Sequence, residues 1–166
     1  MSVTSVLARI SVIVAMAALA LGYGLGDVWI GVGPVLAVGV LWLIGLRPGW
    51  GWIASPGLVL WTAAAAVGLW AGLGAGWMLV GVVAALSAWD LDHFTRRLGA
   101  AGRVEQAVAM ERAHLVRLLA VDAVGLALGG LALTVHVRLG FGIALILALV
   151  AVWGLSRAVR FLQNES

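Results

Sequence analysis

Long apolar runs are the feature that most limits how this chain can fold. The stretch from Pro48 to Trp89 contains no charged side chain, and runs of this character recur along the chain. About 20 apolar residues are what an α-helix needs to cross ~30 Å of hydrocarbon. Hydrophobic residues make up 64% of the 166 positions, so a soluble domain of this size could not bury its apolar surface. The sequence predicts an all-α, polytopic helical membrane protein, with residues 1–166 as one transmembrane domain.

The apolar runs and the breaks between them predict six transmembrane helices, arranged as three hairpins. Ser55 and Pro56 are typical of a helix start, and the glycines at 72, 74 and 76 break the uncharged stretch. A single helix over residues 52–89 would be roughly 57 Å long, nearly twice the bilayer core. The expected spans are residues 5–24, 28–46, 56–71, 75–98, 103–135 and 139–161.

The distribution of arginine predicts the orientation. All ten basic residues are arginines, and with six spans and a cytoplasmic N-terminus only Arg138 falls outside. This bias matches the positive-inside rule, which accounts for the basic charge without nucleic-acid binding. The absence of lysine and the abundance of alanine, glycine, valine and arginine suggest a GC-rich prokaryotic genome. We expect a multi-pass protein of a prokaryotic cytoplasmic (inner) membrane, with both termini in the cytoplasm.

The first span also resembles a secretory signal. Arg9 precedes the apolar run at residues 10–17, and Ala18-Leu19-Ala20 is a candidate cleavage site. We expect an uncleaved first helix. Cleavage would leave the orientation of the other spans unchanged.

Charge is concentrated between Asp90 and Asp122, where ten of the seventeen charged residues and two of the three histidines lie. The glycines at 99 and 102 are the breaker in this stretch, so Leu98 is expected to face Arg103 across a turn. A helix over residues 103–135 would be ~50 Å long, and roughly 20 Å of it would project beyond the hydrocarbon. The sequence predicts that helices 4 and 5 extend into a cytoplasmic helical hairpin at residues 90–117.

That register places Asp90 level with Glu111. His93 follows Asp90 by three residues, and His114 follows Glu111 by three. Helical bundles present paired carboxylates and imidazoles to two metal ions in this way. The usual additional carboxylates from two other helices are missing, so a mononuclear iron or zinc site is the more suitable form. Haem ligation by the two histidines, or general acid–base chemistry, is a further alternative.

A solvated helix face explains the same residues, and we favour it. Asp92 with Arg96, and His93 with Arg97, have the i,i+4 spacing of pairs on a helix surface. On this interpretation no cofactor is expected.

Asp122 lies about one turn inside the fifth span, where a carboxylate generally faces protein and finds a partner. Arg9 is the first candidate for an interhelical pair and Arg117 the second. A proton-relay role is the alternative.

Three function classes remain. The first is a non-catalytic accessory or assembly subunit of a membrane complex, which presents the basic hairpin and binds a protein partner or a second copy through small-residue helix faces such as Gly125 and Gly129. The second is a metal-binding membrane protein or oxidoreductase. The third is a small oligomeric transporter, suggested by a faint repeat in which Gly24-Leu25-Gly26 recurs as Gly72-Leu73-Gly74.

Overall fold

The computed structural model describes residues 3–47, 50–100 and 107–134. The chain divides into two compact units, Met1–Leu133 and Thr134–Ser166. Only the first unit is described in any detail, so the expected sixth span at residues 139–161 lies outside the described residues. The single domain over residues 1–166 stays a prediction for the same reason.

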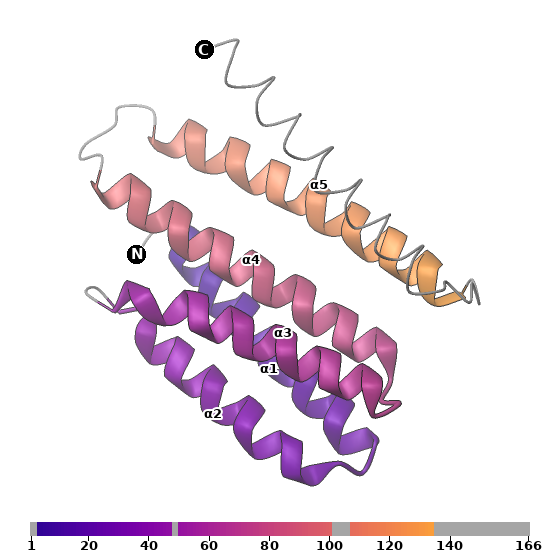
Figure 1. Ribbon diagram of the computed structural model, residues 1–166. Coiled ribbons are helices and arrows are strands. Elements are labelled where there is room, and N and C mark those ends of the chain that lie inside the picture. Colours follow the sequence, from indigo (N-terminus) through magenta and orange to yellow (C-terminus); the bar gives the residue numbers. More distant parts are fainter. Residues whose placement is uncertain (1–2, 48–49, 101–106, 135–166) are drawn as a thin grey trace, which may run out of the picture. The chain divides into compact units, whose positions relative to one another are not determined.

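The described part of the first unit is built from helices, as predicted (Figure 1). Four stretches are long and apolar enough to cross a membrane, and Trp29–Gly45 is a shorter apolar helix. The elements are α1 (Val3–Leu25), α2 (Trp29–Gly45), the short 3₁₀ helix η1 (Gly51–Ile53), α3 (Ala54–Trp70), α4 (Ala75–Ala100) and α5 (Ala107–Thr134).

The core of the unit lies between α1, α2, α3 and α4. Helix α1 makes its most extensive contacts with α4 and also packs on α2, while α3 packs on both α2 and α4. The largest fully buried side chains are Trp42, Trp61, Leu19, Met78, Val12 and Thr4. Many of the outward-facing side chains, such as Ile30 and Trp70, are also large and apolar. Such an exterior suits lipid, which solvates apolar side chains as well as a protein interior does.

Glycines set the distance between α1 and α4. A Cβ atom on Gly22 would lie 2.5 Å from Met78 Cε, and one on Gly81 would lie 2.7 Å from Leu19 Cγ. Neither position has room for a side chain, so the helices approach more closely there than larger residues would allow. Such contacts matter in a membrane because van der Waals packing replaces the hydrophobic drive between helices.

The turns after α1 and α3 share one hydrogen-bonded motif. After α3, Leu73 N donates to Gly68 O at 2.9 Å and Gly72, with φ of 78°, occupies the left-handed position. After α1, Val28 N donates to Tyr23 O at 3.0 Å and Asp27, with φ of 58°, takes the equivalent place. Both are Schellman-type helix ends.

These turns change the alignment of the expected repeat. The sequence repeat pairs Gly24 with Gly72, an offset of 48, whereas the structurally equivalent residues are Asp27 and Gly72, an offset of 45. Gly24 lies inside α1 and not in the turn. The glycine matches therefore do not mark equivalent positions in the two turns.

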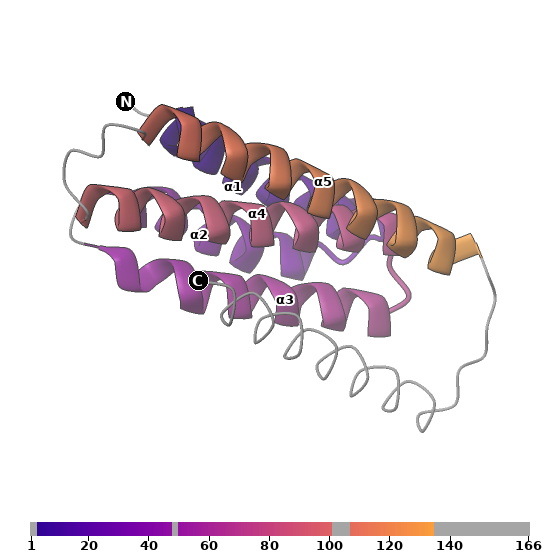
Figure 2. The same cartoon turned by 90° about the horizontal axis from the view of Figure 1, so that it is seen from above.

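Helix α5 runs antiparallel to α4, and Figure 2 shows it alongside α1 and α4. Phe94 stacks on His114, Ser87 bonds to Asp122, and Leu79 approaches Gly129. Within its most apolar stretch, Met110–Thr134, none of the side chains of α5 is buried. Side-chain contacts along one face therefore hold α5 to the other described helices.

Candidate functional site

Charged side chains gather in one half of the unit, which we call the charged end. It holds the starts of α1, α3 and α5 and the ends of α2 and α4, because Thr4 contacts Glu111, Gly45 contacts Arg96, and Ser55 contacts Trp89. Asp27 is the only charged residue at the opposite end within the described ranges. The described charged residues of the charged end are Arg9, Arg47, Asp90, Asp92, Arg96, Arg97, Glu111, Arg112 and Arg117.

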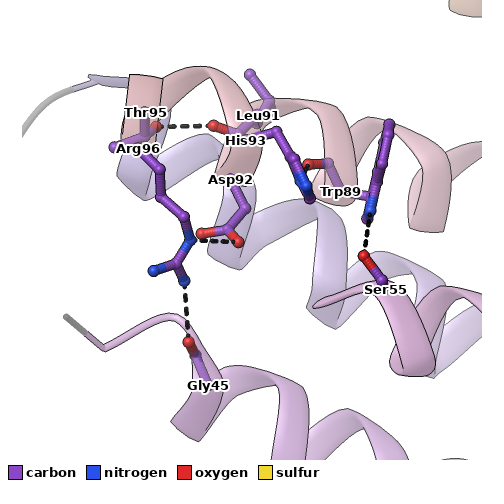
Figure 3. A network of polar contacts seen from close by, with 8 residues as sticks. All are labelled: Gly45, Ser55, Trp89, Leu91, Asp92, His93, Thr95 and Arg96. Atoms are coloured by element: carbon purple, nitrogen blue, oxygen red, sulfur yellow. Dashed lines mark hydrogen bonds and ion pairs between the residues drawn. The ribbon is translucent and has the colours of Figure 1, made fainter. Parts of the chain in front are cut away.

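Asp92 and Arg96 form the predicted i,i+4 pair, shown in Figure 3. Arg96 Nε donates to Asp92 Oδ2 at 2.9 Å, and the aspartate is only 5% exposed. The same guanidinium donates from Nη2 to Gly45 O at 3.1 Å, at the last residue of α2. A cation at a helix C-terminus satisfies an unpaired carbonyl and is favoured by the helix dipole. The pair therefore joins α4 to the end of α2.

Arg96→Lys is expected to lower the free energy of unfolding in detergent by about 1 kcal/mol. A lysine ammonium carries its donors at one point, so it cannot reproduce two hydrogen bonds made by separate nitrogens of a rigid guanidinium. Thermal unfolding followed by circular dichroism measures the change. Arg97→Lys is the matched control, because Arg97 is exposed and is the next residue on the same helix. Equal effects of the two substitutions would show that the contact with α2 contributes nothing.

Glu111 binds the start of α1. Its Oε1 accepts a hydrogen bond of 2.8 Å from the backbone N–H of Thr4, in the first turn of that helix. The first N–H groups of a helix lack partners within it, and the dipole there favours a negative charge. Glu111 therefore serves as a helix cap supplied by another helix.

His114 lies between α4 and α5 at the charged end. Its Nε2 is 2.9 Å from Asp90 Oδ2, although the pair does not have hydrogen-bond geometry. The imidazole stacks on Phe94 with ring centroids 3.9 Å apart and planes 2° apart. Stacking fixes the orientation of the ring beside the carboxylate.

His93 interacts with α4 itself and not with His114. Its ring packs on that of Trp89 in a tilted arrangement, with centroids 4.2 Å apart and planes 37° apart, and its Nδ1 lies 3.1 Å from Trp89 O. Trp89 in turn donates to Ser55 Oγ at 3.2 Å, as Figure 3 shows. The predicted pairing of His93 with Arg97 is not among these contacts.

Of the four candidate metal ligands, the structure brings together only Asp90 and His114. His93 packs on Trp89, and Glu111 caps α1. No group of three or more histidine and acidic side chains suited to a metal ion occurs among the described residues. The described geometry therefore does not assemble the predicted ligand set.

The cause is the register between α4 and α5. If Leu98 faced Arg103, Phe94 would face residue 107, but it stacks on His114, seven positions further along. Helix α4 continues through Gly99 to Ala100, and the described part of α5 starts at Ala107. A shift of seven residues is about two helical turns. The prediction that Asp90 and Glu111 lie at the same height on the two helices is therefore wrong.

Asp122 has a different partner from the one predicted. Its Oδ2 accepts a hydrogen bond of 2.6 Å from Ser87 Oγ of α4. Arg9 is exposed, and no ion pair joins it to Asp122 in the described part of the chain. The sequence offered no sign of Ser87, because a serine that bonds to the carbonyl four residues back is also common in apolar helices.

A pocket of about 480 Å³ lies along the contact between α4 and α5, and it extends from Ser87 and Asp122 to Asp90 and His114. Ser87 and Asp122 also border a second, almost wholly apolar hollow of about 450 Å³ between α1, α4 and α5. The first pocket is lined by Leu86, Ser87, Trp89, Asp90, His114, Arg117, Leu118, Val121 and Asp122.

Comparisons with protein-family models, with curated proteins and with solved structures find no match for this chain.

Proposed function

We infer that this chain is an integral protein of a prokaryotic cytoplasmic membrane and a non-catalytic accessory or assembly subunit of a membrane complex. It presents the charged ends of α4 and α5 on the cytoplasmic side, with both termini on that side. Helix α5 is the element that a protein partner binds.

The membrane location is supported by length and by surface chemistry. Four helical stretches have the length and apolar composition of membrane spans. Large apolar side chains also cover the outside of these helices, where a water-soluble protein would carry polar groups. The orientation follows from the arginines, nine of which the six-span topology places on the cytoplasmic side.

The exposure of α5 is the observation that carries the proposed role. Its apolar side chains are exposed along most of the described helix, and Leu119 is 74% exposed. Helix α1, by comparison, buries a third of its most apolar stretch in the same unit. A helix held mainly through Glu111, His114 and Asp122 keeps a broad apolar face for a neighbouring helix in the membrane.

Site-directed cross-linking tests this role, because the chain contains no cysteine and the purified variant can be labelled at one position before it is returned to membranes. Leu119→Cys carries a photoreactive maleimide on the exposed face of α5. Val59→Cys is the matched control, an apolar position on α3 that is 66% exposed. In membranes of the organism that encodes the chain, we expect the Leu119 probe to form an adduct with one different protein, identified by mass spectrometry. The Val59 probe is expected to form few protein adducts.

Three outcomes contradict the proposal. Adducts with lipid alone would mean that α5 faces the bilayer. If all protein adducts have twice the mass of the chain, the partner is a second copy and the chain is a homo-oligomer. Equal labelling of the same protein from α3 and α5 would indicate random collision and no defined binding face.

A further inference from the structure

Asp122 lies in the middle of α5, fifteen residues after Ala107 and twelve before Thr134. It is the one ionisable residue in the apolar second half of that helix, residues 118–134. Carboxylates within apolar spans are costly, and they commonly mark proton or ion pathways. The contacts of Asp122 are therefore relevant to proton binding as well as to the stability of the fold.

The hydroxyl of Ser87 has two acceptors but only one hydrogen. Its Oγ lies 2.6 Å from Asp122 Oδ2 and 2.9 Å from Val83 O, and both distances suit hydrogen bonds. When the Asp122 carboxylate is ionised, the hydroxyl donates to it. When the carboxyl is protonated, Asp122 donates to Ser87 Oγ, and the serine hydrogen turns to Val83 O.

Both protonation states are thus satisfied by the same heavy-atom positions. Proton uptake forms one O–H bond on Asp122 and rotates one hydroxyl hydrogen from the carboxylate to a carbonyl. Release reverses both changes, and the proton leaves to water. Neither step leaves a buried polar group without a partner, which is the usual cost of neutralising a charge in an apolar setting.

The pocket between α4 and α5 gives this pair a route to water. It is partly open, and it extends from Ser87 and Asp122 to Asp90, His114 and Arg117 at the charged end. These three are the ionisable groups that share the pocket with Asp122. From α1, the neighbouring apolar hollow presents Ser11 as its polar side chain and no ionisable group. The pocket that leads from Asp122 to the charged end is therefore polar, whereas the hollow between Asp122 and α1 is apolar.

We propose that Asp122 and Ser87 form a proton-binding site, which exchanges protons with the cytoplasmic side through the pocket lined by Asp90, His114 and Arg117. The ligand is the proton itself. The site is independent of the accessory role, because it requires no partner chain.

Infrared difference spectroscopy of the full chain in lipid nanodiscs tests the proposal by acid–base titration. A protonated carboxyl has a carbonyl stretching band whose frequency depends on its hydrogen bonds. We expect one pH-dependent component that disappears in Asp122→Asn and changes frequency in Ser87→Ala. The amide introduced by Asp122→Asn retains a donor for Ser87 Oγ, so this variant imitates the protonated state and should fold.

Asp27→Asn provides the control, because Asp27 is an exposed carboxylate at the opposite end. It should remove a component that Ser87→Ala does not affect. Carbon-13 labelling of aspartate in the unmodified chain gives a second measurement, because the four aspartates are then separated from the glutamates without substitution.

Deuterium oxide tests the route. Exchange through the pocket should shift the Asp122 component promptly to lower frequency. The proposal is overturned if Asp122 shows no protonated component at any pH at which the protein stays folded. It is also overturned if Ser87→Ala leaves that component unchanged, or if the component fails to exchange with deuterium.

Discussion

Trp61→Ala is expected to cause the largest loss of stability of any single side-chain truncation in the described core. Trp61 is 0% exposed, its ring centroid lies 5.1 Å from that of Trp42, and its Nε1 donates to Val35 O at 3.2 Å. Truncation of a buried aromatic costs about 3 to 5 kcal/mol in water-soluble cores. Part of that cost is transfer to water, which is smaller in a membrane, so we expect the lower end, about 3 kcal/mol.

Trp70→Ala is the matched control, since Trp70 is on the same helix and is 91% exposed. Its effect should stay within about 0.5 kcal/mol, as for other exposed positions. Equilibrium unfolding in mixed micelles, followed by far-ultraviolet circular dichroism, measures both. Similar losses in the two variants would mean that the contact of α3 with α2 does not depend on Trp61.

Gly81→Ile is expected to destabilise the contact between α1 and α4 by about 1 to 3 kcal/mol, the usual cost of overpacking. A Cβ atom at this position would lie 2.7 Å from Leu19 Cγ, and Leu19 is fully buried and cannot move aside freely. Because α1 makes its most extensive contacts with α4, separation of this pair affects the whole core.

Gly76→Ile isolates the steric effect. Gly76 is also in α4, and a Cβ there meets nothing within 4 Å. Both substitutions replace glycine by isoleucine in one helix, and the propensity gain is the smaller one at Gly76, in the first turn. A lower stability of Gly81→Ile than of Gly76→Ile therefore reports the clash. If Gly81→Ile is no less stable than Gly76→Ile, the close approach of α1 and α4 is not needed for folding.

The first four helices were predictable because their signals are local. Apolar runs of sufficient length give the helices, and Gly72 marks the break between α3 and α4, where a left-handed residue is required. The Asp92–Arg96 pair was predictable for the same reason, because i,i+4 neighbours meet on any helix.

The contacts between α4 and α5 were not predictable in the same way. Gly99 was expected to end the fourth helix, but α4 continues through it to Ala100. A single glycine in a helix costs only about 1 kcal/mol, which other contacts readily offset. An error of seven residues in the register of α4 against α5 changed the partners expected for Asp90 and Glu111.

The sequence by itself determined the helical class, the presence of helices long and apolar enough to cross a membrane, and the end of the unit that collects charge. These features depend on composition and on residues close together in the chain. Only the tertiary structure decided that Glu111 caps α1, that Arg96 reaches the end of α2, and that Ser87 binds Asp122. Two of these partners are backbone atoms, and each depends on the register of one helix against another. That register is set by packing between distant segments, which local sequence patterns do not encode.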